Sequence, residues 1–421
     1  MTFTSFIPRQ LSLAHVCCIA IMLRVAWALL IPVIPISDSV AYDTFAQNIW
    51  QHGTYGWTED KPTAFWPVGT SAIYSVLFML FGYGYTTIVT LNIICTVAII
   101  FLTRALCDRF FENKHIGIYS ALAIALWPTL ILYTTILASE LPYMAVLMAA
   151  FYLLTNKNTH IITLGISSGI LFAIAYYIRP LAIIVFAIGA FYLCVYTNNK
   201  RVSILRSGLS LLVLALLVSP WAYRNYQLYD AFIPMSTNGG STLWMGNQPG
   251  TNGGYASTPK ALAHLDEHLR NQTLKKEALD YIQQEPVAFL TRTLTKFIQF
   301  HLRETIGVSW NEKGIVQVLG EKALLPLKVI TQSYWSAFLL LALFGIMIMI
   351  KQKGFWRTAF HPFILMWAST AGIHAIIVSQ DRYHIPITPI VSAFAVYAVI
   401  FIGSLYKKNK HSYENNELNH E

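Results

Sequence analysis

The chain has 421 residues, of which 55% are hydrophobic and only 12% are charged, and it carries a formal net charge of +9. An ordinary soluble domain has about 25% charged residues, so this composition excludes a soluble protein and predicts an integral membrane protein. We expect an all-α polytopic fold, because apolar runs of about 20 residues cross a bilayer as helices.

Ten apolar runs predict membrane-spanning helices. They cover residues 11–34, 85–105, 116–135, 140–155, 160–178, 180–197, 204–222, 327–350, 360–378 and 385–405. A further apolar piece at 67–83 is short and rich in glycine and aromatic residues, so the expected number of spans is ten or eleven. The first run contains Arg24 and no small-residue cleavage site, which favours a retained helix over a removed signal peptide.

Lysine and arginine placement predicts the orientation of these spans. With the N-terminus inside, the inside connections hold fourteen Lys and Arg residues and the short outside connections hold three. This bias predicts a multi-pass protein of the cell membrane with both termini in the cytoplasm. Much of the positive charge is thereby explained, so nucleic acid is not an expected partner.

The predicted topology divides the chain into four parts. Residues 1–222 form an N-terminal membrane part whose first outside loop is 35–66, residues 223–327 an outside region, residues 328–405 the C-terminal membrane helices, and residues 406–421 a disordered inside tail. In the outside region, a Gly- and Asn-rich loop precedes a charged helical stretch at 259–285. The amphipathic stretch "PVAFLTRTLTKFIQFHLRETIG" that follows predicts a helix lying along the membrane surface.

Acidic and basic residues gather in the connections predicted to lie outside. Five separate connections contribute, and the residues are Asp38 and Asp43, Glu140, Arg179, Arg224 with Asn225, and Arg382 with His384. An anionic lipid-linked substrate suits such a surface, because arginine binds phosphate bidentately and a carboxylate acts as general base on an acceptor hydroxyl.

Simpler roles are open for the same residues. Asp38 follows Ser37 at the start of a helix-compatible stretch and is alternatively only an N-cap. Asp38 and Asp43 are about 140° apart around a helix, so at most one of them is expected to act on the substrate. Glu140 suits a helix N-terminus through its charge. The three outside arginines are alternatively anchors for lipid headgroups.

Five stretches give the chain its resemblance to a known family. They are "SDSVAYDTFAQNI", "ASELPY", "YYIRPLA", "SPWAYRNY" leading to "PMSTNGGSTLWMGN", and "DRYHIPITP". Their order and membrane side resemble GT-C-type membrane glycosyltransferases, in the branch with the protein O-mannosyltransferases and the lipid A aminoarabinose transferases. The resemblance implies transfer of a sugar from a polyprenyl-phosphate donor to a lipid, glycan or protein acceptor on the outer, periplasmic face.

The resemblance also implies roles for individual residues. Asp38 is the expected catalytic base, and Glu140 is the acidic residue of the second outside loop and the second expected catalytic residue. The expected substrate-binding residues are Tyr42, Asp43, Arg179, Arg224, Asn225, Asn238, Arg382 and His384. No cofactor is expected, and a divalent metal ion near Asp38 and Glu140 is left open. Lys61 departs from the Lys-Pro-Pro pattern of relatives that modify lipid A, so we assign it no phosphate contact.

Other functions remain as alternatives to this hypothesis. The nearest is another envelope enzyme acting on lipid-linked sugars, such as a ligase or polymerase. A transporter needs polar groups on a path that reaches both faces, commonly with internal repeats, whereas here the polar groups crowd one face. A non-catalytic scaffold accounts for the spans but not for the scattered acids.

Overall fold

The structure is a computed structural model that describes residues 11–156 and 160–418. Helices dominate this part of the chain, and a two-stranded antiparallel hairpin joins β1 (Gly56–Thr58) to β2 (Lys61–Pro62). The α-helices are α1 (Leu13–Leu30), α2 (Asp38–His52), α3 (Gly69–Phe81), α4 (Tyr85–Phe110), α5 (Lys114–Ala125), α6 (Pro128–Leu132), α7 (Glu140–Leu154), α8 (Ile161–Ile178), α9 (Ala182–Tyr196), α10 (Lys200–Tyr229), α11 (Gly239–Met245), α12 (Glu267–Gln284), α13 (Pro286–Leu302), α14 (Ile306–Trp310), α15 (Glu312–Leu319), α16 (Leu324–Lys353), α17 (Phe355–Ala359), α18 (Pro362–Ile376) and α19 (Thr388–Leu418).

Six of the described helical segments are long and apolar enough to cross a membrane. They contain α1, α4, α8, α10, α16 and the first part of α19, and the pair α5–α6, bent by 53°, makes a seventh. All the predicted spans are helical, but α7, α9 and α18 have 15 residues each. A helix of this length covers about 22 Å, less than the hydrocarbon core of about 30 Å. Ten spans therefore exceed the six or seven that length and composition support, because apolar runs also form shorter helices such as α7, α9 and α18.

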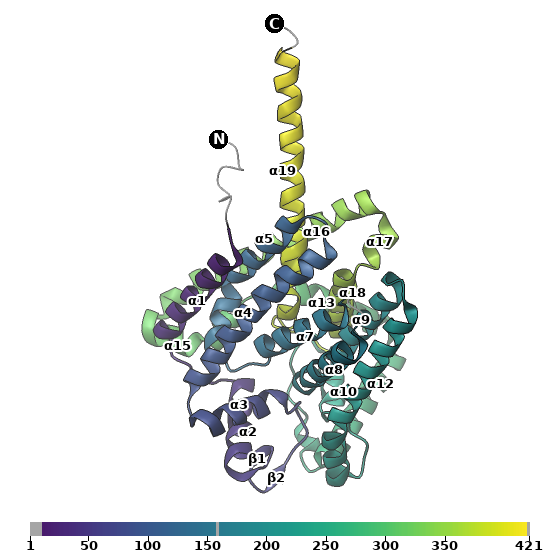
Figure 1. Cartoon of the computed structure of the whole chain (residues 1–421). Coiled ribbons are helices and arrows are strands. Elements are labelled where there is room, and N and C mark those ends of the chain that lie inside the picture. The colour runs from purple at the N-terminus through teal and green to yellow at the C-terminus, as the bar shows by residue number, and fades with distance from the viewer. Residues whose placement is uncertain (1–10, 157–159, 419–421) are drawn as a thin grey trace.

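The two ends of the molecule are formed by different segments of the chain. The start of α1 and the end of α19 lie at one end, whereas α2, α3 and the β1–β2 hairpin lie at the opposite end (Figure 1). Between them, α7 packs against α4, α8 and α9, and most of its side chains are buried. Because α7 begins with Glu140, the core of the bundle positions that carboxylate.

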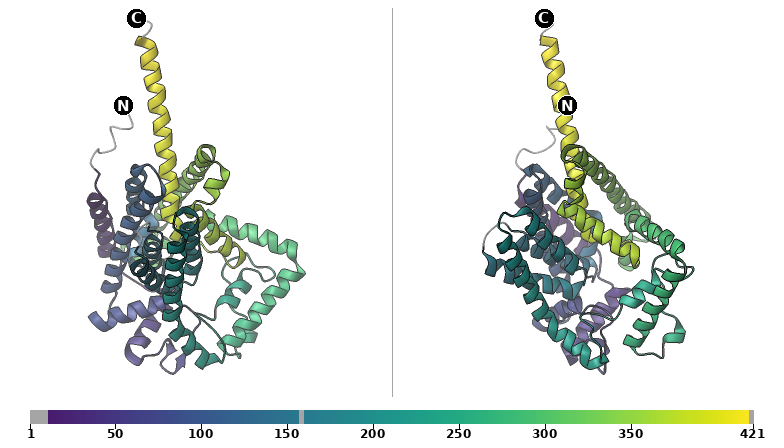
Figure 2. Two further views of the ribbon diagram at one scale, coloured as in Figure 1. Left: turned by 45° about the vertical axis from the view of Figure 1, so that its right-hand side comes forward. Right: turned by 90° about the vertical axis from the view of Figure 1, so that its right-hand side faces the viewer.

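The region after α10 projects to one side of the bundle, where α12 and α13 are seen most clearly in Figure 2. The predicted amphipathic helix is α13. It packs against α18 and exposes Val287, Leu290 and Leu294 by 75%, 65% and 61%. An exposed apolar face of this kind suits the boundary between water and lipid.

Three predicted boundaries differ from the structure. α10 continues to Tyr229, so the boundary at 222 falls inside a helix, and α16 already begins at Leu324. The structure continues α19 to Leu418, past the boundary at residue 406, and the disorder of the tail stays a prediction. The tail contains neither proline nor glycine, so its polar sequence does not interrupt a helix that is already formed. Residues 419–421 lie outside the described part of the chain.

Candidate active site

Asp38 is the first residue of α2 and pairs with an arginine from the far end of the chain. Its Oδ2 accepts a hydrogen bond from Nη2 of Arg382 at 2.7 Å. Ser37 is the N-cap residue, and α2 has no side-chain cap. The carboxylate of Asp38 therefore serves the ion pair and not the capping role that was its simpler alternative.

Backbone strain accompanies this placement of Asp38. Ser37 has a φ of 50° and a ψ of −129°, a backbone conformation that residues other than glycine rarely adopt. Such residues cost about 1–3 kcal/mol and cluster at functional sites. The chain turns sharply at Ser37, and α2 starts at the residue that contacts Arg382.

Glu140 forms a second ion pair at the start of α7. Its Oε1 accepts from Nη2 of Arg179 at 2.6 Å, and its side chain is almost fully buried. Nε and Nη2 of Arg179 also donate to Oγ of Ser139, at 2.9 and 2.8 Å. Glu140 is thus both a first-turn acid of a helix and the buried partner of a half-buried cation.

Three helices hold the extended segment that leads to Glu140. Asn92 of α4 donates to the carbonyl of Ile136 at 3.1 Å, Ser39 of α2 to that of Leu137 at 2.8 Å, and Tyr74 of α3 to that of Ala138 at 3.1 Å. Buried carbonyls outside helices need such partners. Because Ser39 is next to Asp38, its bond also ties the two acids together.

Tyr42 lies among both ion pairs. It stands one helical turn after Asp38, on the same face of α2. Burial raises the pKa of Tyr42 to about 12; the carboxylates of Asp38 and Glu140 add to the rise, and Arg179 and Arg382 oppose it. All four charges therefore act on one phenol, and we call these five residues the outer charge cluster.

The loop after α18 brings Arg382 to this cluster. Nε of Arg382 donates to the side-chain carbonyl of Gln380 at 3.0 Å, and the guanidinium lies 4.8 Å from the ring centre of Trp310. Burial alone lowers the pKa of Arg382, but Asp38 and other nearby groups raise it well above its usual value. The arginine is held as a cation directly opposite Asp38.

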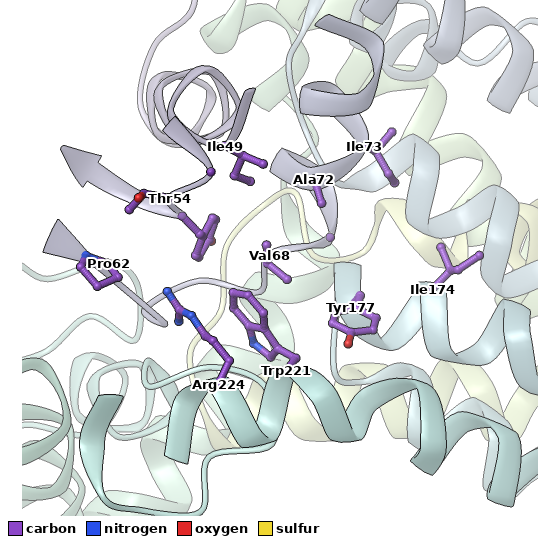
Figure 3. A pocket seen from close by; sticks show the side chains of 13 residues that line it. Ile49, Thr54, Pro62, Val68, Ala72, Ile73, Ile174, Tyr177, Trp221 and Arg224 are labelled. Carbon is purple, nitrogen blue, oxygen red and sulfur yellow. The ribbon is translucent and has the colours of Figure 1, made fainter. Parts of the chain in front are cut away.

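Arg224 does not join the outer charge cluster. It lines a groove of about 630 Å³ with Trp221 of the same helix, where Ile49, Ile73, Ile174 and others provide mostly apolar walls (Figure 3). The guanidinium lies 4.5 Å from the ring centre of Trp221, and its Nη1 donates to the carbonyl of Thr63 at 2.7 Å. The groove therefore combines apolar walls with one cation.

Four other predicted binding residues are also not members of the cluster. Their contacts are with other side chains or with backbone carbonyls, or they cap a helix. Oδ2 of Asp43 accepts from Gln47, Tyr83 and Tyr85. Asn225 is buried and donates to the carbonyl of Ile233 at 3.0 Å, whereas Asn238 is the N-cap residue of α11. His384 is fully buried, and its Nδ1 lies 2.9 Å from the carbonyl oxygen of Phe300.

Three polar residues with many contacts were missed from sequence. Glu267 at the start of α12 accepts from the amide of Ala64 and the hydroxyl of Tyr229, and so ties the loop between α2 and α3 to the region after α10. Lys296 and Glu304 are fully buried. Helical periodicity treats such residues as surface charges, so no local pattern distinguished them.

The metal ion that was left open has no preformed site in the described residues. They contain no group of three or more His, Cys, Asp or Glu side chains placed to hold a metal ion. Oxygens of Asp38 and Glu140 are instead in contact with arginine nitrogens. A divalent metal ion near these two acids was left open from sequence and stays untested.

The chain resembles solved membrane proteins, whereas no sequence-defined protein family and no curated protein matches it. An oligosaccharyltransferase of Archaeoglobus fulgidus in the apo form matches with a TM-score of 0.55 and 14% identity, over 96% of this chain and 52% of that one. The oligosaccharyltransferase AglB of the same organism, in complex with an inhibitory peptide and a dolichol-phosphate, matches with 0.53 and 13%, over 95% and 52%.

ArnT from Cupriavidus metallidurans, bound to undecaprenyl phosphate, matches with a TM-score of 0.54 and 11% identity, over 91% of this chain and 59% of that one. The chain thus spans only about half the length of the solved structures that it matches. At these identities the likeness concerns the fold. The chain has the GT-C-type all-α membrane fold, and this prediction is confirmed.

Proposed function

We propose that the protein is a membrane glycosyltransferase that moves a sugar from a polyprenyl-phosphate donor to an acceptor at the outer face of the membrane. The observation that carries this proposal is the outer charge cluster, where two carboxylates and two arginines meet around Tyr42. The neighbours with the same fold support it, because two of them were solved with dolichol-phosphate or undecaprenyl phosphate.

The arginines of the cluster have capacity for a phosphate. Nη2 of Arg179 and of Arg382 binds a carboxylate, but neither Nη1 forms a hydrogen bond within residues 11–156 and 160–418. Arginine forks bind phosphate oxygens strongly and with defined geometry. A donor phosphate therefore recruits Arg382 from Asp38, which frees the carboxylate of Asp38 to act as a base.

Asp38 then takes the proton of the acceptor hydroxyl. The acceptor oxygen forms a bond to the anomeric carbon of the sugar, and the bond between that carbon and the phosphate oxygen breaks. Polyprenyl phosphate leaves with its electron pair, and the arginines stabilise the added negative charge in a site with little water. General-base catalysis of this kind contributes about 10²–10⁴-fold in rate.

The groove beside Arg224 is the proposed place for the donor lipid. Ile73 and Ile174 form its wall on two apolar helices, and Arg224 stands near the β1–β2 hairpin (Figure 3). An isoprenoid chain with an anionic head matches this combination of apolar wall and cation. The face of α2 that runs from Ile49 through Tyr42 to Asp38 connects the groove with the cluster.

A panel assay tests the proposed function. Purified protein is incubated with several polyprenyl-phosphate sugars and with lipid, glycan and peptide acceptors, with Mg²⁺ or with a chelator, and the products are identified by mass spectrometry. We expect one donor to yield a glycosylated acceptor and free polyprenyl phosphate. Absence of transfer from every donor, by protein that remains folded, contradicts the proposal.

Membrane sidedness needs a separate test. We propose that the hairpin end faces the periplasm and that both termini are cytoplasmic, on the basis of the charge bias. Reporter fusions after residues 60 and 383 are expected to report outside, and fusions after 112 and 354 inside. An outside signal at 112 contradicts the orientation.

A further inference from the structure

A buried acid lies near the buried histidine that ends the Arg382 loop, which we define as residues 380–384. Glu304 follows α13, His384 ends the loop, and both side chains are fully buried. Oε1 of Glu304 lies 4.0 Å from Nε2 of His384. Within the described part of the chain, neither Oε2 of Glu304 nor Nε2 of His384 has a hydrogen-bond partner by geometry. Buried polar atoms left unpaired cost about 1–3 kcal/mol each, so this placement calls for an explanation.

The histidine offers a lone pair toward the acid. A carbonyl oxygen only accepts hydrogen bonds, so Nδ1 of His384 carries the hydrogen that faces the carbonyl of Phe300 at 2.9 Å. The ring stacks on Trp335 with centroids 4.1 Å apart, which fixes its orientation. Burial lowers the pKa of His384 to about 3. The ring is therefore neutral near pH 7, and Nε2 is an acceptor without a donor.

Glu304 is able to supply that donor. Burial raises its pKa to about 8, against the opposing effects of Trp127 and Thr129 and with a further rise from Asp381. Near pH 7 the carboxyl group therefore carries a proton. Its Oε1 accepts from Nε1 of Trp127 at 2.8 Å, so Oε2 is the atom left for the hydroxyl.

The two groups join segments that belong to different parts of the outer charge cluster. Trp127 is the N-cap residue of α6, whose chain continues to Glu140. His384 stands two residues after Arg382. Glu304 thus contacts the segment that leads to the second acid and the loop that carries the arginine opposite Asp38.

We propose that Glu304 is a positioning residue. As an uncharged acid it donates a hydrogen bond to Nε2 of His384, and this bond holds the Arg382 loop within reach of Asp38. The 4.0 Å separation joins Nε2 to Oε1, which already accepts from Trp127, so the carboxyl group must turn its Oε2 toward Nε2 for this hydrogen bond to form. This role rests on the proposed function, because the position of Arg382 affects catalysis only if that arginine binds the donor.

Other groups face Glu304 or hold the same loop, and they enter any dependence on pH. His384 and Asp381 belong to the loop, Tyr334 of α16 interacts electrostatically with Glu304, and Gln332 accepts from the backbone amide of Glu304. Where α18 ends and the chain continues toward the Arg382 loop, Nζ of Lys296 donates to the carbonyls of Ile376 and Ile377 at 2.8 and 3.2 Å. Burial lowers the pKa of Lys296 to about 8, so it titrates in the same range as Glu304.

Hydrogen exchange of the loop amides tests the proposal without an activity assay. The full-length protein in lipid nanodiscs is compared at pH 7 and pH 9 with Glu304→Gln, which keeps a donor and an acceptor but cannot ionise. With a pKa near 8, about one tenth of Glu304 is protonated at pH 9. Corrected for intrinsic rates, exchange across residues 380–384 is therefore expected to rise about tenfold in the wild type. The rise in Glu304→Gln is expected to be several-fold smaller. Lys296 is common to both proteins, so the difference between them reports Glu304.

Two further variants separate positioning from simple packing. Glu304→Leu fills the space without hydrogen bonds and is expected to exchange faster at both pH values. Glu321→Gln changes an exposed glutamate and is expected to match the wild type. Equal pH responses of the wild type and Glu304→Gln overturn the proposal, as does wild-type protection in a folded Glu304→Leu. If Glu304→Leu does not fold, the comparison with Glu304→Gln decides alone.

Kinetics then separate this inference from the proposed function. If sugar transfer is found, the donor KM of the wild type should rise more between pH 7 and pH 9 than that of Glu304→Gln, with a smaller change in kcat. An equal rise in both proteins overturns the positioning role. If the exchange result is as expected but no donor supports transfer, Glu304 holds the loop and the proposed function is what fails.

Discussion

Buried and half-buried arginines in this protein bind two different kinds of partner. Nη1 of Arg24 donates to the carbonyl of Ala125 at the end of α5, at 2.9 Å. Arg109 and Arg206 likewise donate to backbone carbonyls near the end of α7. We call these the carbonyl-bound arginines. Arg179 and Arg382 are the carboxylate-bound arginines, because their partners are the side chains of Glu140 and Asp38.

The partner, and not the buried charge, distinguishes a candidate site from a structural contact. A backbone carbonyl at a helix end is fixed by the helix, so a carbonyl-bound arginine satisfies an acceptor that would otherwise be unpaired. A side-chain carboxylate is an anion, and a phosphate competes with it for the same guanidinium. Asp38 is also 23% exposed, so a ligand reaches this pair more easily than a contact inside the bundle.

The largest expected effect is that of Asp38→Asn, because it removes the proposed base and leaves the arginine in place. Asparagine keeps an oxygen that accepts from Arg382 but cannot take a proton. Sugar transfer is expected to fall by about 10² or more, whereas the melting temperature and donor binding stay near wild type.

Asp43→Asn is the matched control for this variant. Asp43 contacts Tyr83 and Tyr85, apart from the outer charge cluster, and its replacement is expected to be much milder. A folded and active Asp38→Asn protein removes Asp38 from the catalytic role.

Arg24→Met tests the other side of the comparison. The change leaves the carbonyls of Ile124 and Ala125 without their buried donor, which is expected to lower stability by about 2 kcal/mol. Thermal unfolding measures the loss, and the folded fraction should keep its donor KM. A changed donor KM at unchanged stability breaks the distinction between the two groups of arginines.

Arg382→Lys is expected to change the donor KM and not the stability, the reverse of Arg24→Met. Lysine retains the charge but not the planar fork, so it pairs with Asp38 and binds phosphate less well. The donor KM should rise about tenfold, equivalent to about 1.4 kcal/mol, with little change in melting temperature. Donor titrations that are identical for both proteins return Arg382 to the role of a headgroup anchor.

Ser37→Gly is expected to have the smallest effect and sharpens the account of the site itself. Glycine adopts the positive φ of residue 37 without a steric penalty, although it adds freedom to the unfolded chain. A gain of up to about 1 kcal/mol is expected in thermal unfolding, with unchanged transfer. A loss of stability means that the serine side chain forms contacts that outweigh the strain.

Much of the site was visible in the sequence as a set of residues, but not as a set of pairs. Asp38, Glu140, Arg179 and Arg382 were selected because the predicted topology placed their connections on one side. Arg224 was selected by the same reasoning, yet it lies in a separate groove beside Trp221. Topology predicts the membrane side of a residue, whereas its distance from other residues on that side depends on how the helices pack.

The sequence alone determined the helical membrane class, the amphipathic helix α13 and the gathering of charge in certain connections, because composition and periodicity are local properties of the chain. Only the tertiary structure decided that Arg382 meets Asp38, a contact across 344 residues, and that α7 is too short to span a bilayer by itself. It also decided that Glu304 is buried beside His384. Burial of a charged residue depends on every element packed around it, so no window of sequence contains the information.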